Sequence, residues 1–108
     1  MDRTISVSVD QAGGVTADIV AAVTGKTIRV VSFVLSVGGA AVTVKSTLQD
    51  KTANTVRATL VGNATAPVVY SYKGSDKDPA FEVAQGDALE LVTGTASAVS
   101  GFLTFQYV

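Results

Sequence analysis

Short segments of alternating apolar and polar residues, separated by glycine-containing breaks, constrain this chain more than any other feature of its sequence. Ile5, Val7 and Val9 are separated by single serines, and residues 99–108 end in the same alternation. A period of two residues is typical of a β-strand that buries one face. The apolar residues are mostly valine and alanine, with abundant threonine and serine, and β-branched residues favour strands over helices. The sequence therefore predicts an all-β protein.

The spacing of the breaks predicts about eight or nine short strands in an antiparallel, jelly-roll-like β-sandwich. The expected strands are 3–9, 19–23, 27–37, 41–49, 55–61, 67–72, 80–84, 88–93 and 99–108. We expect one domain over residues 1–108, in which residues 1–10 form an N-terminal arm or the first strand. The glycine pair at 38–39 suggests that 27–37 and 41–49 form a hairpin.

The composition removes most routes to catalysis. The chain has no cysteine, no histidine and no tryptophan, and only 16% of its residues are charged. It therefore lacks a thiolate nucleophile, a histidine base for a serine or cysteine triad, and the usual zinc ligands. We expect a protein that is not an enzyme, with no catalytic residue, metal, cofactor or small-molecule substrate.

The charge and hydropathy patterns also limit the partners. The net charge is −1, and the eight basic residues are scattered along the chain, so we expect no nucleic-acid partner. The longest unbroken apolar run covers only residues 19–23, whereas a membrane-spanning helix needs about 20 apolar residues. The first residues lack the pattern of a signal peptide. We therefore expect no membrane partner.

The segment 27–37 departs from the one-sided alternation, because both of its faces contain apolar residues. One face consists of Val31, Phe33, Leu35 and Val37, and the other contains Ile28, Val30 and Val34. A two-layer sandwich covers only one face of each sheet. The second face therefore needs cover from a loop, from the N-terminal arm or from another subunit.

Two tyrosines and two aspartates are the candidates for contact with a ligand. Tyr70 and Tyr72 lie two residues apart, on the same face of an expected strand, where aromatic rings can stack on sugars or bases. Asp76 and Asp78 follow in a polar loop, and such oxygen-rich loops can hold calcium. Packing of the tyrosines in the core or at a subunit contact, and a solvated turn for the aspartates, are the alternative interpretations.

Several strand-and-turn segments resemble a known group of proteins. Residues 25–36, 41–46, 81–91 and 99–108 resemble, in the same order, stretches of small β-sandwich proteins from the virions of tailed bacteriophages, of the head decoration (cement) type. Residues 50–79 depart from this pattern: the loop before residue 81 is more charged, and it lacks a glycine–tryptophan element. The resemblance rests on structural segments rather than on a functional motif.

The resemblance implies a structural virion protein, made in the cytoplasm of a bacterial host. Such a protein would bind the major capsid protein on the outer surface of the head as a homotrimer and stabilise the shell. The candidate subunit or capsid contacts are Ile5, Val7, Ile28, Val30 and Val34. The alternative is a receptor- or carbohydrate-binding domain of a phage tail fibre, or a carbohydrate-binding module, that uses Tyr70, Tyr72 and the loop 73–79.

Overall fold

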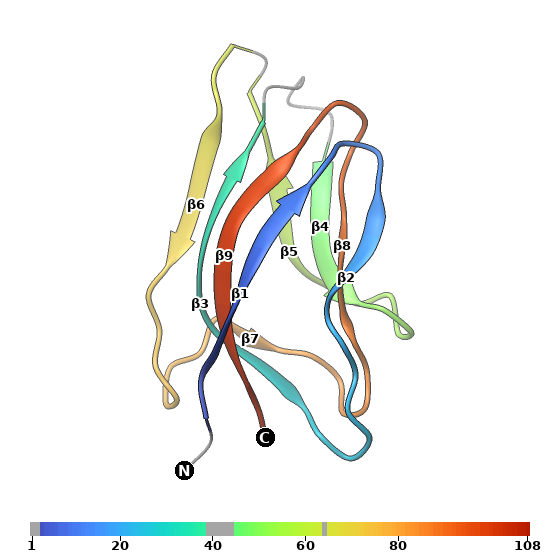
Figure 1. Ribbon diagram of the computed structural model, residues 1–108, viewed down its shortest axis with the longest axis vertical. Helices are drawn as coiled ribbons and strands as arrows, with labels where there is room; N and C mark the ends of the chain where they lie inside the picture. The colour runs from blue at the N-terminus through green and yellow to red at the C-terminus, as the bar shows by residue number, and fades with distance from the viewer. Residues whose placement is uncertain (1–2, 39–44, 64) are drawn as a thin grey trace.

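The computed structural model describes residues 3–38, 45–63 and 65–108, which form nine strands in two antiparallel sheets (Figure 1). The five-stranded sheet has the order β1 (Ile5–Gln11), β9 (Val99–Tyr107), β3 (Ile28–Val37) and β6 (Val68–Tyr72), with the short β7 (Phe81–Glu82) also paired to β3. The four-stranded sheet has the order β2 (Thr16–Val20), β8 (Leu89–Val92), β4 (Lys45–Asp50) and β5 (Val56–Val61). The predicted antiparallel β-sandwich is therefore confirmed.

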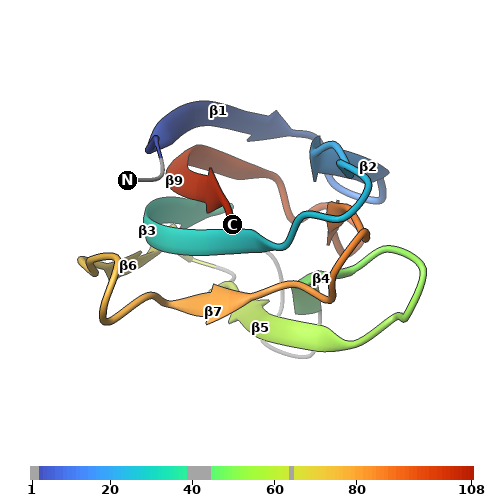
Figure 2. The same ribbon diagram turned by 90° about the horizontal axis from the view of Figure 1, so that it is seen from below.

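The strand pairs follow the jelly-roll pattern. β1 pairs with β9, β2 with β8, β3 with β6 and β4 with β5, as if one long hairpin had its bend between β4 and β5. When this hairpin is rolled up, the pairs β1–β9 and β3–β6 fall in one sheet and the pairs β2–β8 and β4–β5 in the other. In addition, β9 pairs with β3, and β8 pairs with β4. Figure 2 shows β1, β9 and β3 side by side in this order. No helix long and apolar enough to span a membrane occurs in the described parts of the chain.

The expected hairpin of residues 27–37 and 41–49 is wrong. β3 lies in the five-stranded sheet between β9 and β6, whereas β4 lies in the four-stranded sheet between β8 and β5. Residues 41–44 lie outside the described residues, as do residues 1–2 of the expected arm; from Ile5 onward that arm is strand β1. Each of the two strands buries a row of apolar side chains, and alternation alone does not distinguish two strands that are adjacent in a sheet from two that face each other across the core.

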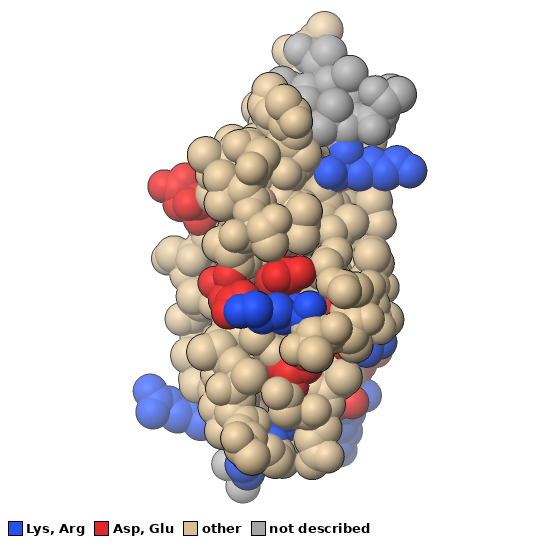
Figure 3. Space-filling view, turned by 90° about the vertical axis from the view of Figure 1, so that its right-hand side faces the viewer, with Lys and Arg blue, Asp and Glu red and all other residues tan. Residues whose placement is uncertain are grey.

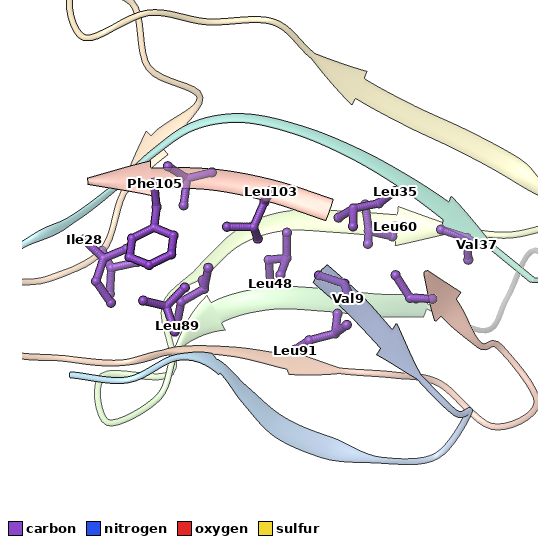
Figure 4. Close-up of a cluster of buried hydrophobic side chains, with 14 residues drawn as sticks. Val9, Ile28, Leu35, Val37, Leu48, Leu60, Leu89, Leu91, Leu103 and Phe105 are labelled. Atoms are coloured by element: carbon purple, nitrogen blue, oxygen red, sulfur yellow. The ribbon is translucent and has the colours of Figure 1, made fainter. Parts of the chain in front are cut away.

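The core lies between the sheets and is made of the inner faces of both (Figure 4). Leu48 of β4 and Leu103 of β9 are fully buried and come from opposite sheets. The other buried apolar residues of this cluster are Val9, Val20, Ile28, Val30, Leu35, Val37, Leu60, Val83, Leu89, Leu91, Val99 and Phe105. Burial of these side chains is the main favourable contribution to folding.

A β-bulge in β3 explains the two apolar faces of this strand. Val30 is opposite Phe105 of β9 but Ser32 is opposite Thr104, so one extra residue, Val31, is inserted at this point. An inserted residue reverses which side chains face the core. Ile28 and Val30 before the bulge, and Leu35 and Val37 after it, are therefore all completely buried.

The bulge corrects the predicted subunit contacts. Ile28 and Val30 were expected on an outer face, but both belong to the core between the sheets and are inaccessible to a partner. Val34 lies after the bulge and is 38% exposed. The second apolar face is thus not continuous along the strand, and most of it needs no cover from a subunit.

Replacement of Gly101 by alanine should destabilise the fold more than a comparable replacement at Gly14. Both glycines have a positive φ, 139° and 72° respectively. A Cβ atom at Gly101 would collide with the carbonyl oxygen of Val34 in β3, whereas no atom lies within 4 Å of one at Gly14. Gly14→Ala should lower the free energy of unfolding by about 1 kcal/mol, and Gly101→Ala by about 2 kcal/mol or more. Urea denaturation measures both, and equal losses would contradict this account.

Candidate functional site

The hydroxyl group of Tyr70 connects the two sheets. It accepts a hydrogen bond from the backbone N–H of Val61, at 3.0 Å, and donates one to the carbonyl oxygen of Val61, at 2.7 Å. Tyr70 belongs to the five-stranded sheet and Val61 to the edge strand β5 of the four-stranded sheet. The ring itself packs against the core. Tyr70 therefore joins the two sheets where they meet at one edge of the sandwich, and its polar atom is already engaged.

Tyr72 and the two aspartates hold the loop between β6 and β7. The hydroxyl group of Tyr72 donates a hydrogen bond to the carbonyl oxygen of Asp78, at 3.1 Å, and its ring stacks on Phe33 with a centroid distance of 6.5 Å. Burial raises the pKa of Tyr72. The carboxylate of Asp76 accepts a hydrogen bond from the side-chain amide of the buried Gln106, at 2.8 Å. The loop is thus folded back over β9.

The four candidate ligand contacts do not form one open platform. Tyr72 meets the backbone of Asp78, whereas Asp76 contacts β9 and Tyr70 contacts β5. No group of three or more acidic side chains that could hold a metal ion occurs among the residues that the structure describes. Each of these contacts supports the fold, which leaves few free polar atoms of the two tyrosines for a ligand.

Two buried aspartates, whose roles are not evident from the sequence, fix the loops at one end of the sandwich. Asp50 is fully buried and accepts two hydrogen bonds from Arg57, at 2.9 and 2.7 Å, and one from the N–H of Ala84, at 3.1 Å. Asp87 accepts backbone hydrogen bonds from Thr52, at 2.9 and 3.0 Å, and from Ala53 and Ala88. Both side chains therefore have a structural role, since their oxygens satisfy donors of the same loops.

A groove of about 440 Å³ lies between β1 and β2, where the edges of the two sheets approach each other. Val7, Val9 and Ile19 contribute apolar atoms to its wall, and Asp10 and Asp18 are its acidic residues. The carboxylate of Asp18 is paired with Lys51 at 3.0 Å. The groove is thus the open seam of the sandwich, with one of its two carboxylates already neutralised.

The remaining predicted contacts differ in how accessible they are. Ile5 and Val7 are partly buried and pack against the core from the edge strand β1. Val34 is exposed on the outer side of the five-stranded sheet, directly opposite Phe102, which is 44% exposed. Phe102 was not among the residues singled out from the sequence. The alternation in residues 99–108 indicates its position, because Phe102 lies on the opposite face of the strand from Leu103 and Phe105.

Phe102 and Val34 lie in a surface without charged side chains, which we call the neutral face. It comprises the outward residues in the middle of the five-stranded sheet: Ser6, Ser8, Ser32, Val34, Ser36, Val69, Ser71, Ser100, Phe102 and Thr104. Among the described residues, the charged side chains at this face lie at its ends: Asp10 at one end, and at the other the ion pair of Arg29 and Glu82, at 2.8 Å, together with Asp76, which accepts a hydrogen bond from Gln106 at 2.8 Å.

The four-stranded sheet differs in this respect. Figure 3 views the molecule from the side of β2 and β8, and it shows acidic and basic side chains in contact at the centre of that side. Lys51 pairs with Asp18, and Glu90 accepts a hydrogen bond from Gln49 at 2.8 Å. The two outer surfaces of the sandwich are thus chemically distinct.

Comparison of the chain with protein-family models, with curated proteins and with solved structures finds no match. The structure itself defines the class: an all-β, two-sheet antiparallel sandwich.

The stability contributed by Asp87 should depend on pH. Burial alone would raise the pKa of Asp87, but the backbone donors of Thr52, Ala53 and Ala88 outweigh it and lower the pKa. An aspartate has a pKa of about 3.9 in an unfolded chain, so this stabilisation is complete above that value and is lost as the pH falls through the lower folded-state value. Asp87→Asn should therefore reduce the free energy of unfolding by about 1–3 kcal/mol at neutral pH, and by less below about pH 4.

Urea denaturation at a series of pH values measures this difference. Asp10→Asn, on the exposed side of β1, is the matched control and should change the free energy of unfolding by less than about 0.5 kcal/mol. A gap between wild type and Asp87→Asn that stays constant from neutral pH to about pH 3 would contradict the assigned role of this carboxylate.

Proposed function

We propose that the protein is a non-enzymatic structural component of a bacteriophage virion. It is a decoration protein that binds the major capsid protein on the outer surface of the head as a homotrimer and stabilises the shell. In this proposal it is made in the cytoplasm of the bacterial host and functions in the virion. The neutral face, with its exposed Phe102, is the observation that carries the proposal, because it has the chemistry of a contact surface between the subunits of the homotrimer.

The fold is compatible with this function without deciding it. Jelly rolls occur in viral capsid proteins, in lectin domains and in cupins, so the choice among them rests on surface chemistry. A cupin-like enzyme would need metal-binding or catalytic side chains, and the chain has neither histidine nor cysteine. A decoration protein needs only a stable body and contact surfaces that repeat with the symmetry of the shell.

A trimer suits this function on energetic grounds. Once one subunit is bound, the contacts of the other two form at a high effective concentration, so weak individual contacts add up to tight binding. A small chain of 11.0 kDa can therefore bind a large shell without one extensive interface.

The carbohydrate-binding alternative has less support from the side chains that it requires. The hydroxyl groups of Tyr70 and Tyr72 are bonded within the chain, and the ring of Tyr72 stacks on Phe33. Sugar-binding sites instead combine accessible aromatic faces with free polar groups. We therefore favour the decoration protein.

Co-sedimentation with capsids tests the proposal. Purified protein is mixed with heads that contain only the major capsid protein of the phage that encodes this chain. At about 10 µM it should pellet with the heads, saturate at a fixed stoichiometry and raise the temperature at which the heads disrupt. Heads already saturated with unlabelled protein are the control for non-specific pelleting. Protein that stays in the supernatant at this concentration would contradict the proposal, and binding to a glycan array would instead support the alternative.

A further inference from the structure

Half of the large exposed hydrophobic side chains in the described parts of the chain lie on one surface. In these parts of the chain the large exposed hydrophobic side chains are Val15, Val23, Val34, Val56, Val69 and Phe102. Three of these six belong to the neutral face: Phe102 at 44% exposure, Val34 at 38% and Val69 at 62%. A soluble monomer rarely leaves such a cluster in water, so its occurrence on one surface indicates a contact site.

The strand register places these three side chains next to each other. Phe102 of β9 is directly opposite Val34 of β3, and Val34 is opposite Ser71 of β6. Val69 lies two residues from Ser71 on β6, so it is the diagonal neighbour of Val34. The cluster therefore crosses three adjacent strands, from β9 through β3 to the edge strand β6.

Small uncharged residues surround the cluster. Ser8 of β1 is opposite Phe102, and Ser36 and Ser100 face each other one step further along the strands. On the other side, Ser32 and Thr104 share a hydrogen bond of 2.6 Å. Short side chains allow a second surface to approach closely, and hydroxyl groups both donate and accept hydrogen bonds, so they can pair with their own kind.

The absence of charge indicates which partner this surface fits. In a closed homo-oligomer, residues near the rotation axis face their own copies in the neighbouring subunits, so a charged residue there would meet its like. Valine, phenylalanine, serine and threonine carry no such penalty. A partner of different sequence would tolerate charged residues on this surface, because opposite charges could pair across the contact. The outer surface of the opposite sheet contains Asp18, Lys51 and Glu90 and therefore lacks this uncharged character. The net charge of −1 adds little repulsion between whole subunits.

We propose that the neutral face packs against other copies of this chain around a symmetry axis, with Phe102 at the centre of the contact. The proposal builds on the homotrimer of the proposed function, for which it assigns the subunit interface, but the contact itself requires no capsid. The charged residues at the two ends of the face, Asp10 at one and Arg29 and Asp76 at the other, then lie at its rim, where they remain solvated.

Light scattering after gel filtration, at about 50 µM protein, tests the interface. Wild-type protein should have the mass of an oligomer, at least twice the 11.0 kDa of one chain. Phe102→Glu should reduce it to the mass of one chain, since it raises the dissociation constant by about 100-fold or more through like charges at the axis. Val34→Glu should act in the same direction. Val56→Glu is the matched control, because Val56 is 50% exposed on β5 of the other sheet, and it should leave the mass unchanged.

Circular dichroism during thermal unfolding shows whether each variant is folded. Phe102→Ser provides a second variant at the same position that removes the ring without adding a charge, and it should weaken association by at least about ten-fold. A monomeric wild type overturns the inference. So does an oligomer that Phe102→Glu, Phe102→Ser and Val34→Glu leave intact, or that Val56→Glu disrupts equally.

The same proteins separate this inference from the proposed function. A wild-type oligomer that dissociates on Phe102→Glu but does not pellet with capsids supports the interface and contradicts the decoration function. A wild-type monomer that pellets with capsids overturns the interface and the homotrimer, and supports only the binding to the capsid.

Discussion

The burial of one apolar face of each sheet against the other is the constraint on which the rest of this structure depends. Every strand must present its apolar residues to the same interior, and the central strand β3 must do so along its whole length. The bulge at Val31 makes this possible, because it brings Ile28 and Val30 to the same side as Leu35 and Val37. As a consequence, Val34 lies on the outer surface of the sheet and remains in contact with solvent.

The alternation in the sequence was sufficient to predict the sandwich, since side-chain period and β-branched composition are local properties. One strand was placed wrongly: residues 19–23 were expected to form it, whereas β2 covers Thr16–Val20 and residues 21–23 lie outside the strands. It did not predict how β3 and β4 are placed, because neighbours within a sheet and neighbours across the core bury the same kind of residue. The bulge was also missed. In each half of β3, on either side of the bulge, the side chains alternate regularly between the two faces of the sheet. The shift between the two halves depends on pairing with β9, which is distant in sequence.

The candidate site was harder to predict, because the roles of polar side chains depend on long-range contacts. Tyr70 was singled out for its ring, yet its hydroxyl group joins β6 to β5. Asp50 and Asp87 belong to no motif in the sequence that marks their role, yet they accept hydrogen bonds from the backbone and arginine donors that hold two loops together. In a small sandwich with few charges, most polar groups of this kind are needed to close loops and edges.

This use of polar groups within the fold explains why the surface, rather than a pocket, carries the functional argument. The groove at the seam of β1 and β2 follows from the sandwich architecture, and Asp18 on its wall is paired with Lys51. The neutral face does not follow from the architecture, because the outer residues of β3, β6 and β9 are free to be charged, as those of the opposite sheet partly are. Phenylalanine and valine surrounded by serine at these positions reduce solubility without stabilising the core. Such a choice of residues is explained if the surface is covered in the assembled protein.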